Sequence, residues 1–312
     1  MFDSKKRSGY GTHVHRKKSF YAAAVIILVS AAVLVFCAVF FDVKNRRGSD
    51  RKELLSLWEN GHYRETYESS GAELQRKPLD FFLLTLRGFS AYQIGISQIN
   101  AFDTLSYIDD CILALRKALL LENAAGRERI YYILGKAYYI KGQGYADLAV
   151  KYLEMARNGG YEAGDIPKYL GLAYVAVRDY RASVAVFTLA LEAGSVSDEL
   201  LLSIAKSYMA MEESDAARAY LMRCVETSRD SVARVTARLH LGEILGEEGD
   251  SEGAEAQYAA VLEEAGENAE AHFRLGELYQ ARGDTTRARW EWRRALWANP
   301  VHEGARRRLN IL

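Results

Sequence analysis

The stretch that decides the fold is Ala269–His302, which reads AEAHFRLGELYQARGDTTRARWEWRRALWANPVH. The stretch before it, Val235–Asn268, reads VTARLHLGEILGEEGDSEGAEAQYAAVLEEAGEN and aligns with it without a gap. Both contain Leu-Gly at repeat positions 7 and 8, Gly-Asp at positions 15 and 16, and Ala at position 20. Self-similarity at a fixed spacing is typical of repeat architectures. The sequence therefore predicts stacked copies of one small structural unit.

This pattern resembles the tetratricopeptide repeat (TPR), whose further positions are an aromatic residue at 24, a small residue at 27 and proline at 32, here Trp292, Ala295 and Pro300. The resemblance implies that each unit is a pair of antiparallel helices. Small residues at two positions let the helices approach closely, and glycine allows the tight turn between them. Because one pair cannot bury its apolar face alone, the units are expected to stack into a right-handed superhelical solenoid.

Extending the alignment towards the N-terminus predicts the organisation of the whole repeat region. We expect five TPR repeats over residues 128–302, two degenerate TPR-like repeats over 47–127, and a capping helix over 303–312. The second degenerate repeat has an insertion at 96–106, which we expect to form a longer turn packed on the first repeat, or alternatively a functional flap. The chain has only three prolines, and this scarcity favours an all-α fold because proline breaks helix interiors.

An apolar run precedes the repeats. Residues 20–41 are 22 residues without a charge, and a helix of this length spans ~33 Å, enough for a hydrocarbon core of ~30 Å. We predict a single transmembrane helix over 19–41, after a basic N-terminal tail (1–18) and before a linker (42–46). The alternatives are a cleaved signal peptide, although the run is long for one, and a lipid-modified Cys37, although bulky Phe36 precedes it.

Charge around the apolar run predicts its orientation. The tail holds six basic residues and one acid, which favours a cytoplasmic N-terminus and an extracytoplasmic repeat domain at the cytoplasmic (inner) membrane. Since the chain has a net charge of zero and the tail carries +5, the residues after the apolar run sum to −5. A mildly acidic main domain argues against a nucleic-acid partner.

The TPR resemblance implies where a partner would bind. In that family, positions 2, 5, 9 and 12 of the first helix of each unit line the concave groove, and this spacing places them on one helical face. In the three middle units the candidate groove residues are Arg129, Tyr132, Lys136, Tyr139, Lys168, Leu172, Lys206 and Met209. The groove is expected to be basic and aromatic here and acidic towards the C-terminus. Lys168 occupies the position of a lysine that clamps a partner's carboxylate in some TPR proteins, but Leu172 replaces the expected asparagine.

Motifs for chemistry are absent from the sequence. There is no phosphate-binding loop, nucleophile elbow, nucleotide fingerprint or convincing metal-ligand spacing, so we predict neither an enzyme nor a cofactor, metal or small-molecule substrate. Cys111 and Cys224 occupy small-residue positions of separate units, which favours buried free thiols over a disulfide. Trp290 and Trp297 share one stripe of the last long helix; we expect them to pack under the cap, or else to form a partner site.

Together these features favour a membrane-anchored protein–protein interaction scaffold or assembly factor that binds a partner segment in its groove. Two alternatives stay open at this point. One is an accessory chaperone for translocated or envelope proteins, and the other is a regulatory subunit of a membrane enzyme complex.

Overall fold

The structure is a computed structural model that describes residues 51–121, 126–194 and 196–310. The predicted tail, transmembrane helix and linker (1–18, 19–41 and 42–46) therefore lie outside the described residues, as does Cys37. Within the described ranges, none of the helices combines the length and the apolar character that a bilayer crossing requires. The described residues form helices and connecting turns, without a strand. The all-α prediction is confirmed for this part of the chain.

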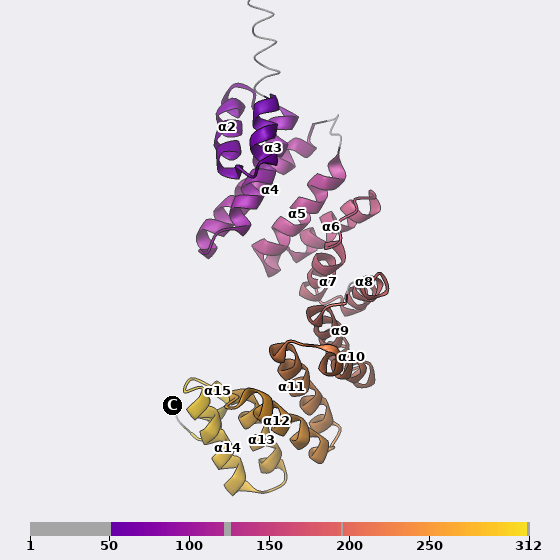
Figure 1. Cartoon of the computed structure of the whole chain (residues 1–312), viewed down its shortest axis with the longest axis vertical. Coiled ribbons are helices and arrows are strands. Elements are labelled where there is room, and N and C mark those ends of the chain that lie inside the picture. Colours follow the sequence, from indigo (N-terminus) through magenta and orange to yellow (C-terminus); the bar gives the residue numbers. More distant parts are fainter. Residues whose placement is uncertain (1–50, 122–125, 195, 311–312) are drawn as a thin grey trace, which may run out of the picture.

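The helices follow one another as antiparallel pairs (Figure 1). The pairs are residues 51–59 with α2 (Tyr63–Arg76), α3 (Phe81–Ile96) with α4 (Ala101–Leu119), α5 (Arg127–Lys141) with α6 (Ala146–Asn158), α7 (Ile166–Ala176) with α8 (Tyr180–Glu192), α9 (Asp198–Ala210) with α10 (Ser214–Thr227), α11 (Ser231–Glu247) with α12 (Ser251–Ala265), and α13 (Ala269–Ala281) with α14 (Thr285–Ala298). A single 3-10 turn, Gln143–Tyr145, links α5 to α6, and α15 (Glu303–Arg308) follows the last pair.

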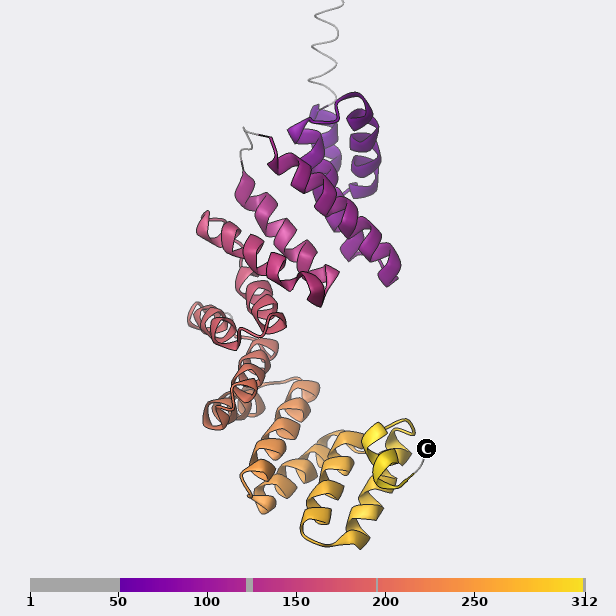
Figure 2. The ribbon, with the colours of Figure 1, turned by 180° about the vertical axis from the view of Figure 1, so that it is seen from behind.

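The pairs stack into a curved array whose two ends lie on the same side of the middle units (Figures 1 and 2). The first helices of successive pairs contact one another, α3 with α5, α5 with α7, α7 with α9, α9 with α11, and α11 with α13. This contact places the first helices on the inside of the curve. Among the second helices, α8 clearly lies on its outer side (Figure 1). Each candidate groove residue named above belongs to an inner helix.

Close helix–helix approach within a pair depends on glycine at repeat position 8. A methyl group on Gly171 of α7 would lie 2.2 Å from the ring of Phe187 on α8, and one on Gly276 of α13 would lie 2.4 Å from Trp292 on α14. Both aromatic side chains are almost completely buried. The leucine beside each glycine is buried too. The Leu-Gly dipeptide therefore lies at the centre of the core in the four pairs that contain it, those of α5, α7, α11 and α13.

The insertion at 96–106 does not form a long turn. Helix α3 ends at Ile96, only residues 97–100 connect it to α4, and α4 begins at Ala101, where the Asn100 side chain accepts a hydrogen bond from the Phe102 backbone N–H. The extra residues lengthen both helices instead of the connection between them. An asparagine N-cap starts α4 early, because it satisfies a backbone donor that would otherwise have no partner.

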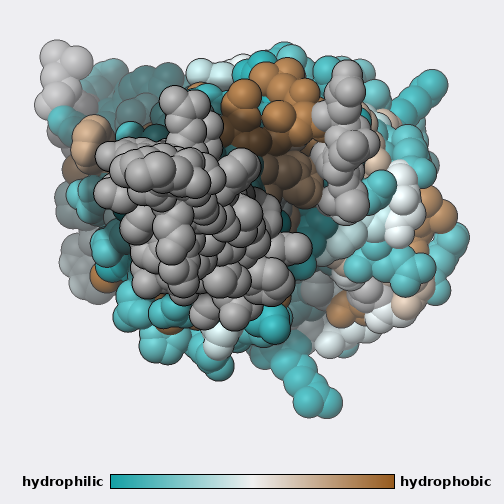
Figure 3. Space-filling model, turned by 90° about the horizontal axis from the view of Figure 1, so that it is seen from above, coloured by the Kyte–Doolittle hydropathy of each residue, from teal (hydrophilic) through white to brown (hydrophobic). Residues whose placement is uncertain are grey.

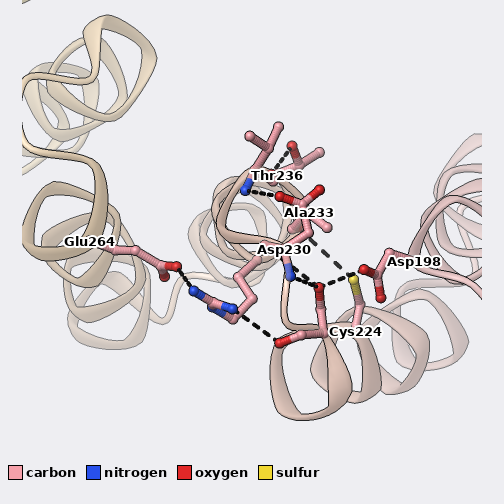
Figure 4. A network of polar contacts seen from close by, with 9 residues as sticks. Asp198, Cys224, Asp230, Ala233, Thr236 and Glu264 are labelled. Atoms are coloured by element: carbon pink, nitrogen blue, oxygen red, sulfur yellow. Dashed lines mark hydrogen bonds and ion pairs between the residues drawn. The ribbon is translucent and has the colours of Figure 1, made fainter.

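A hydrogen-bonded turn connects the fifth and sixth units (Figure 4). Ser228, between α10 and α11, donates to the Asp198 carboxylate at 2.7 Å, and Arg234 of α11 donates to the Ser228 carbonyl at 3.1 Å and forms an ion pair with Glu264 of α12. Cys224 lies beside this turn and is buried and free, as is Cys111. The network ties α9, α11 and α12 to one turn and so fixes the angle between the two units.

Candidate functional site

The inner surface of the third and fourth units is rich in tyrosine. Lys136 of α5 is buried, with its ammonium 4.4 Å from the ring centroid of Tyr169, 4.9 Å from that of Tyr132 and 5.7 Å from that of Tyr92. Aromatic faces attract a cation, and the attraction strengthens when water is excluded. These three rings from α3, α5 and α7 therefore form a cage that Lys136 itself occupies.

Asp165 completes this cluster. It precedes α7 but does not cap that helix; its two carboxylate oxygens accept hydrogen bonds from Lys136 at 2.7 Å and from the Tyr132 hydroxyl at 2.6 Å. Burial acts to raise the pKa of Asp165, but the hydrogen bonds from Lys136 and Tyr132 outweigh it and leave the pKa lowered. Burial and the bond to Asp165 raise the pKa of Tyr132. The cluster thus consists of the Lys136–Asp165 ion pair and the uncharged hydroxyl group of Tyr132.

An apolar hollow of about 250 Å³ lies next to this cluster, between α7, α8 and α9. Leu172, Phe187, Ala190, Val196 and Leu200 supply its apolar lining. Lys168 and Glu199 also border it, and their side chains, 48% and 57% exposed, form an ion pair at 2.7 Å. The hollow has the size and lining to take an apolar side chain, with charged groups at its edge to fix the orientation of what enters.

The structure brings together most of the predicted groove residues but not all of them. Tyr132 and Lys136 join the tyrosine cluster, and Tyr139 packs edge-on against Tyr169 with ring centroids 5.5 Å apart. Lys168 and Leu172 border the hollow. The remaining three predicted residues lie elsewhere. The Arg129 guanidinium lies over the rings of Trp58 and Phe89 from the earlier units. Lys206 is exposed further along α9, and Met209 packs on the core of the fifth and sixth units.

Ion pairs reduce the charge contrast expected along the groove. Lys136 pairs with Asp165, which precedes α7, and Lys168 pairs with Glu199 of α9, so two of the basic residues in the middle of the groove are neutralised. Towards the C-terminus, Arg274 forms ion pairs with Glu243 at 3.1 Å and with Glu270 at 2.7 Å. Arg308 of α15 likewise binds Glu277. The charges neutralise each other because neighbouring inner helices place residues of opposite sign side by side.

Sequence reasoning missed several residues of the site. Tyr92 and Tyr169 of the cluster were not predicted as groove residues, nor were Phe187, Val196 and Leu200 of the hollow. The two acids do follow the groove pattern, because Asp165 and Glu199 both occupy position 2 of a unit, and each pairs with a lysine of the preceding inner helix. No group of three or more His, Cys, Asp or Glu side chains within the described ranges is arranged to hold a metal ion.

Comparisons with known proteins agree with this architecture. Residues 178–311 match the family model described as a tetratricopeptide repeat-like domain. The C-terminal part of a TPR repeat-containing protein from Cytophaga hutchinsonii is 14% identical, with a TM-score of 0.61 over 82% of this chain and 97% of that one. A tetratricopeptide repeat protein from Parabacteroides merdae is 17% identical, with a TM-score of 0.50 over 84% of this chain and 98% of that one.

A third solved structure, pilF of Pseudomonas aeruginosa, is 13% identical, with a TM-score of 0.51 over 72% of this chain and 96% of that one. No curated protein sequence matches the chain. At these identities the likeness concerns the fold alone. The described part of the chain is therefore a solenoid of the TPR type, and its C-terminal half carries the sequence pattern of that class.

Proposed function

We propose that this protein is a non-enzymatic, membrane-anchored scaffold or assembly factor that binds a segment of a partner protein in the inner groove of its third to fifth units. The observation that carries the proposal is the apolar hollow between α7, α8 and α9, bordered by an exposed ion pair and next to the tyrosine cluster. An inner surface with a preformed apolar hollow suits a peptide side chain, and the paired charges around it suit a peptide backbone or polar side chains.

The exposed Lys168–Glu199 ion pair can open, so that one of its members pairs with a charged group of the partner instead. An ion pair in contact with water contributes about 0–1 kcal/mol, so a partner can replace one of its members at little cost. The Lys136–Asp165 pair differs, because Lys136 is buried and held by three rings. We therefore assign the first pair to recognition and the second to the shape of the groove.

Leu172→Glu is expected to abolish partner capture. A carboxylate would replace the apolar side chain of Leu172 in the hollow, and an apolar side chain of the partner that entered would then have to desolvate this charge. Partners would be captured from solubilised membranes with tagged full-length protein and quantified by mass spectrometry, and we expect their recovery to fall by about tenfold or more. Leu189→Glu is the matched control, because Leu189 is 59% exposed on α8 and does not line the hollow.

Thermal melts of both variants would show that the fold is retained. Lys168→Glu, an exposed change that opposes Glu199, should weaken capture as well. Equal recovery of the same partners by Leu172→Glu, Lys168→Glu and wild type would contradict the groove assignment. Capture of many unrelated chains would indicate the chaperone alternative, and one stoichiometric enzyme would indicate the regulatory subunit.

The membrane anchor that we propose is the apolar run 19–41, with the N-terminus in the cytoplasm and the repeats on the other side of the inner membrane. Supporting this placement, the end of the array where residue 51 begins has an apolar surface (Figure 3). Leu79, in the connection between α2 and α3, and Leu120, directly after α4, are 67% and 82% exposed. An apolar end next to an anchor suits contact with a lipid surface.

Extraction with alkaline carbonate should leave the full chain in the membrane fraction. The high pH disrupts electrostatic contacts at the membrane surface but does not release a helix that spans the bilayer. In intact cells, a membrane-impermeant thiol reagent should label Glu252→Cys but not Tyr10→Cys. Cys111 and Cys224 are buried and would give little background. Release by carbonate would contradict the anchor, and the reverse labelling pattern would contradict the orientation.

A further inference from the structure

The outer face of α14 exposes two tryptophans. Trp290 and Trp297 are 53% and 70% exposed, so the expectation that they pack under the cap is wrong. Trp292, by contrast, is buried against Gly276. Seven residues separate the two exposed rings, which places them two helical turns apart on one stripe. Large aromatic residues are rarely left in water without a role, because each exposes a large apolar area.

An arginine holds the two rings as a single surface. The Arg294 guanidinium lies 5.4 Å from the Trp290 ring centroid and 5.5 Å from that of Trp297. It also forms an ion pair with Glu267, at the connection between α12 and α13. Because both rings contact one anchored group, little side-chain freedom remains to be lost when a partner binds.

The same face carries positive charge. Arg289 and Arg293 are exposed beside the tryptophans, and within the described ranges neither forms an ion pair with a carboxylate. The one acid of α14, Glu291, is buried and bonds to His272 at 2.7 Å, so it does not offset these charges. Tryptophan and arginine are the residue types most enriched at binding hot spots.

We propose that this α14 face, formed by Arg289, Trp290, Arg293, Arg294 and Trp297, is a second docking surface, which binds an acidic segment of a partner protein carrying apolar side chains. The two rings would pack on the apolar side chains, while Arg289 and Arg293 pair with carboxylates. This surface lies on the second helix of its pair, whereas the groove residues belong to the first helices of the third to fifth units. A lipid bilayer is the less favoured occupant, because α14 lies at the opposite end of the array from residue 51 (Figure 1).

The test uses the full chain in phosphatidylcholine nanodiscs and two fluorescently labelled peptides. One peptide alternates glutamate pairs with leucine, and the other has glutamine in place of glutamate. We expect the acidic peptide to bind, measured by fluorescence anisotropy, and Trp290→Ala with Trp297→Ala to weaken it by about tenfold or more. Arg289→Gln with Arg293→Gln should weaken binding and reduce its dependence on salt.

Arg223→Gln with Arg229→Gln is the matched control, since both arginines are exposed on or beside the outer helix α10. This control should bind like wild type. A parallel arm measures co-sedimentation of the nanodiscs with vesicles containing phosphatidylglycerol. Failure of the acidic peptide to bind, equal binding of the glutamine peptide, or insensitivity to the α14 changes would overturn the proposal. Loss of vesicle binding alone in the α14 variants would assign the face to lipid and also overturn it.

Discussion

Gly171→Ala is expected to destabilise the repeat domain by about 1–3 kcal/mol, although alanine favours helices over glycine by about 1 kcal/mol. The new methyl group would lie 2.2 Å from the Phe187 ring, which is 1% exposed, so the ring or the helix backbone must shift. Either the two helices separate or the ring leaves its favoured rotamer. Urea unfolding followed by circular dichroism would measure the change, as a lower midpoint or as an early partial transition of the fourth unit.

Gly246→Ala is the matched control for this effect. Gly246 also lies in an inner helix, α11, but the nearest atom to an added methyl group is 3.9 Å away, an ordinary contact. Here the helix preference of alanine acts alone, so stability should stay unchanged or rise by about 0.5–1 kcal/mol. If the two substitutions shift the midpoint equally, close packing at repeat position 8 is not what sets the distance between the helices.

Asp165→Asn is expected to cost about 2 kcal/mol at neutral pH. Removing one partner of a buried ion pair costs roughly 3–5 kcal/mol, and we lower this figure because the Asp165 side chain is 38% exposed and therefore screened by water. The Lys136 ammonium would stay buried among three rings without a counter-charge. Glu199→Gln in the exposed Lys168–Glu199 pair is the control, with an expected change below about 0.5 kcal/mol.

The cost of Asp165→Asn should depend on pH. The pKa of Asp165 is lowered in the folded protein, so the carboxylate stabilises the fold fully above its unfolded pKa of about 3.9. As the pH falls through the lowered folded pKa, the carboxylate becomes protonated and this stabilisation is lost. The difference in unfolding free energy between wild type and Asp165→Asn should therefore be constant near neutral pH and shrink in acid. A difference that grows in acid would contradict the assigned pairing.

The fold followed from the sequence because its signal is local and repeated. Leu275 and Gly276 with Trp292, and their counterparts in earlier units, recur at a fixed spacing, and each copy satisfies the same packing requirement between two adjacent helices. The prediction of a long turn at 96–106 was wrong because it also rested on the repeat pattern alone. A repeat alignment shows only that residues have been added, whereas the Asn100 cap decides that they extend α3 and α4.

The candidate site was predictable only in part. Position within the unit placed Tyr132, Lys136, Lys168 and Leu172 on inner helices, where the structure has them. It did not predict that an internal cage surrounds Lys136, since Tyr92 comes from α3, Tyr169 from α7 and Asp165 from the residue before α7. Nor did it predict which tryptophans of α14 are exposed.

The sequence by itself determined the helical pairs and their order, because these depend on contacts between neighbours along the chain. Which helix of each pair faces inwards was implied only by the resemblance to the TPR. The tertiary structure alone decided the charge of the groove, the hollow beside Leu172 and the exposure of Trp290 and Trp297. The physical reason is distance along the chain. Ion pairs and hollows between units depend on the angle at which one pair stacks on the next, and no single repeat encodes that angle.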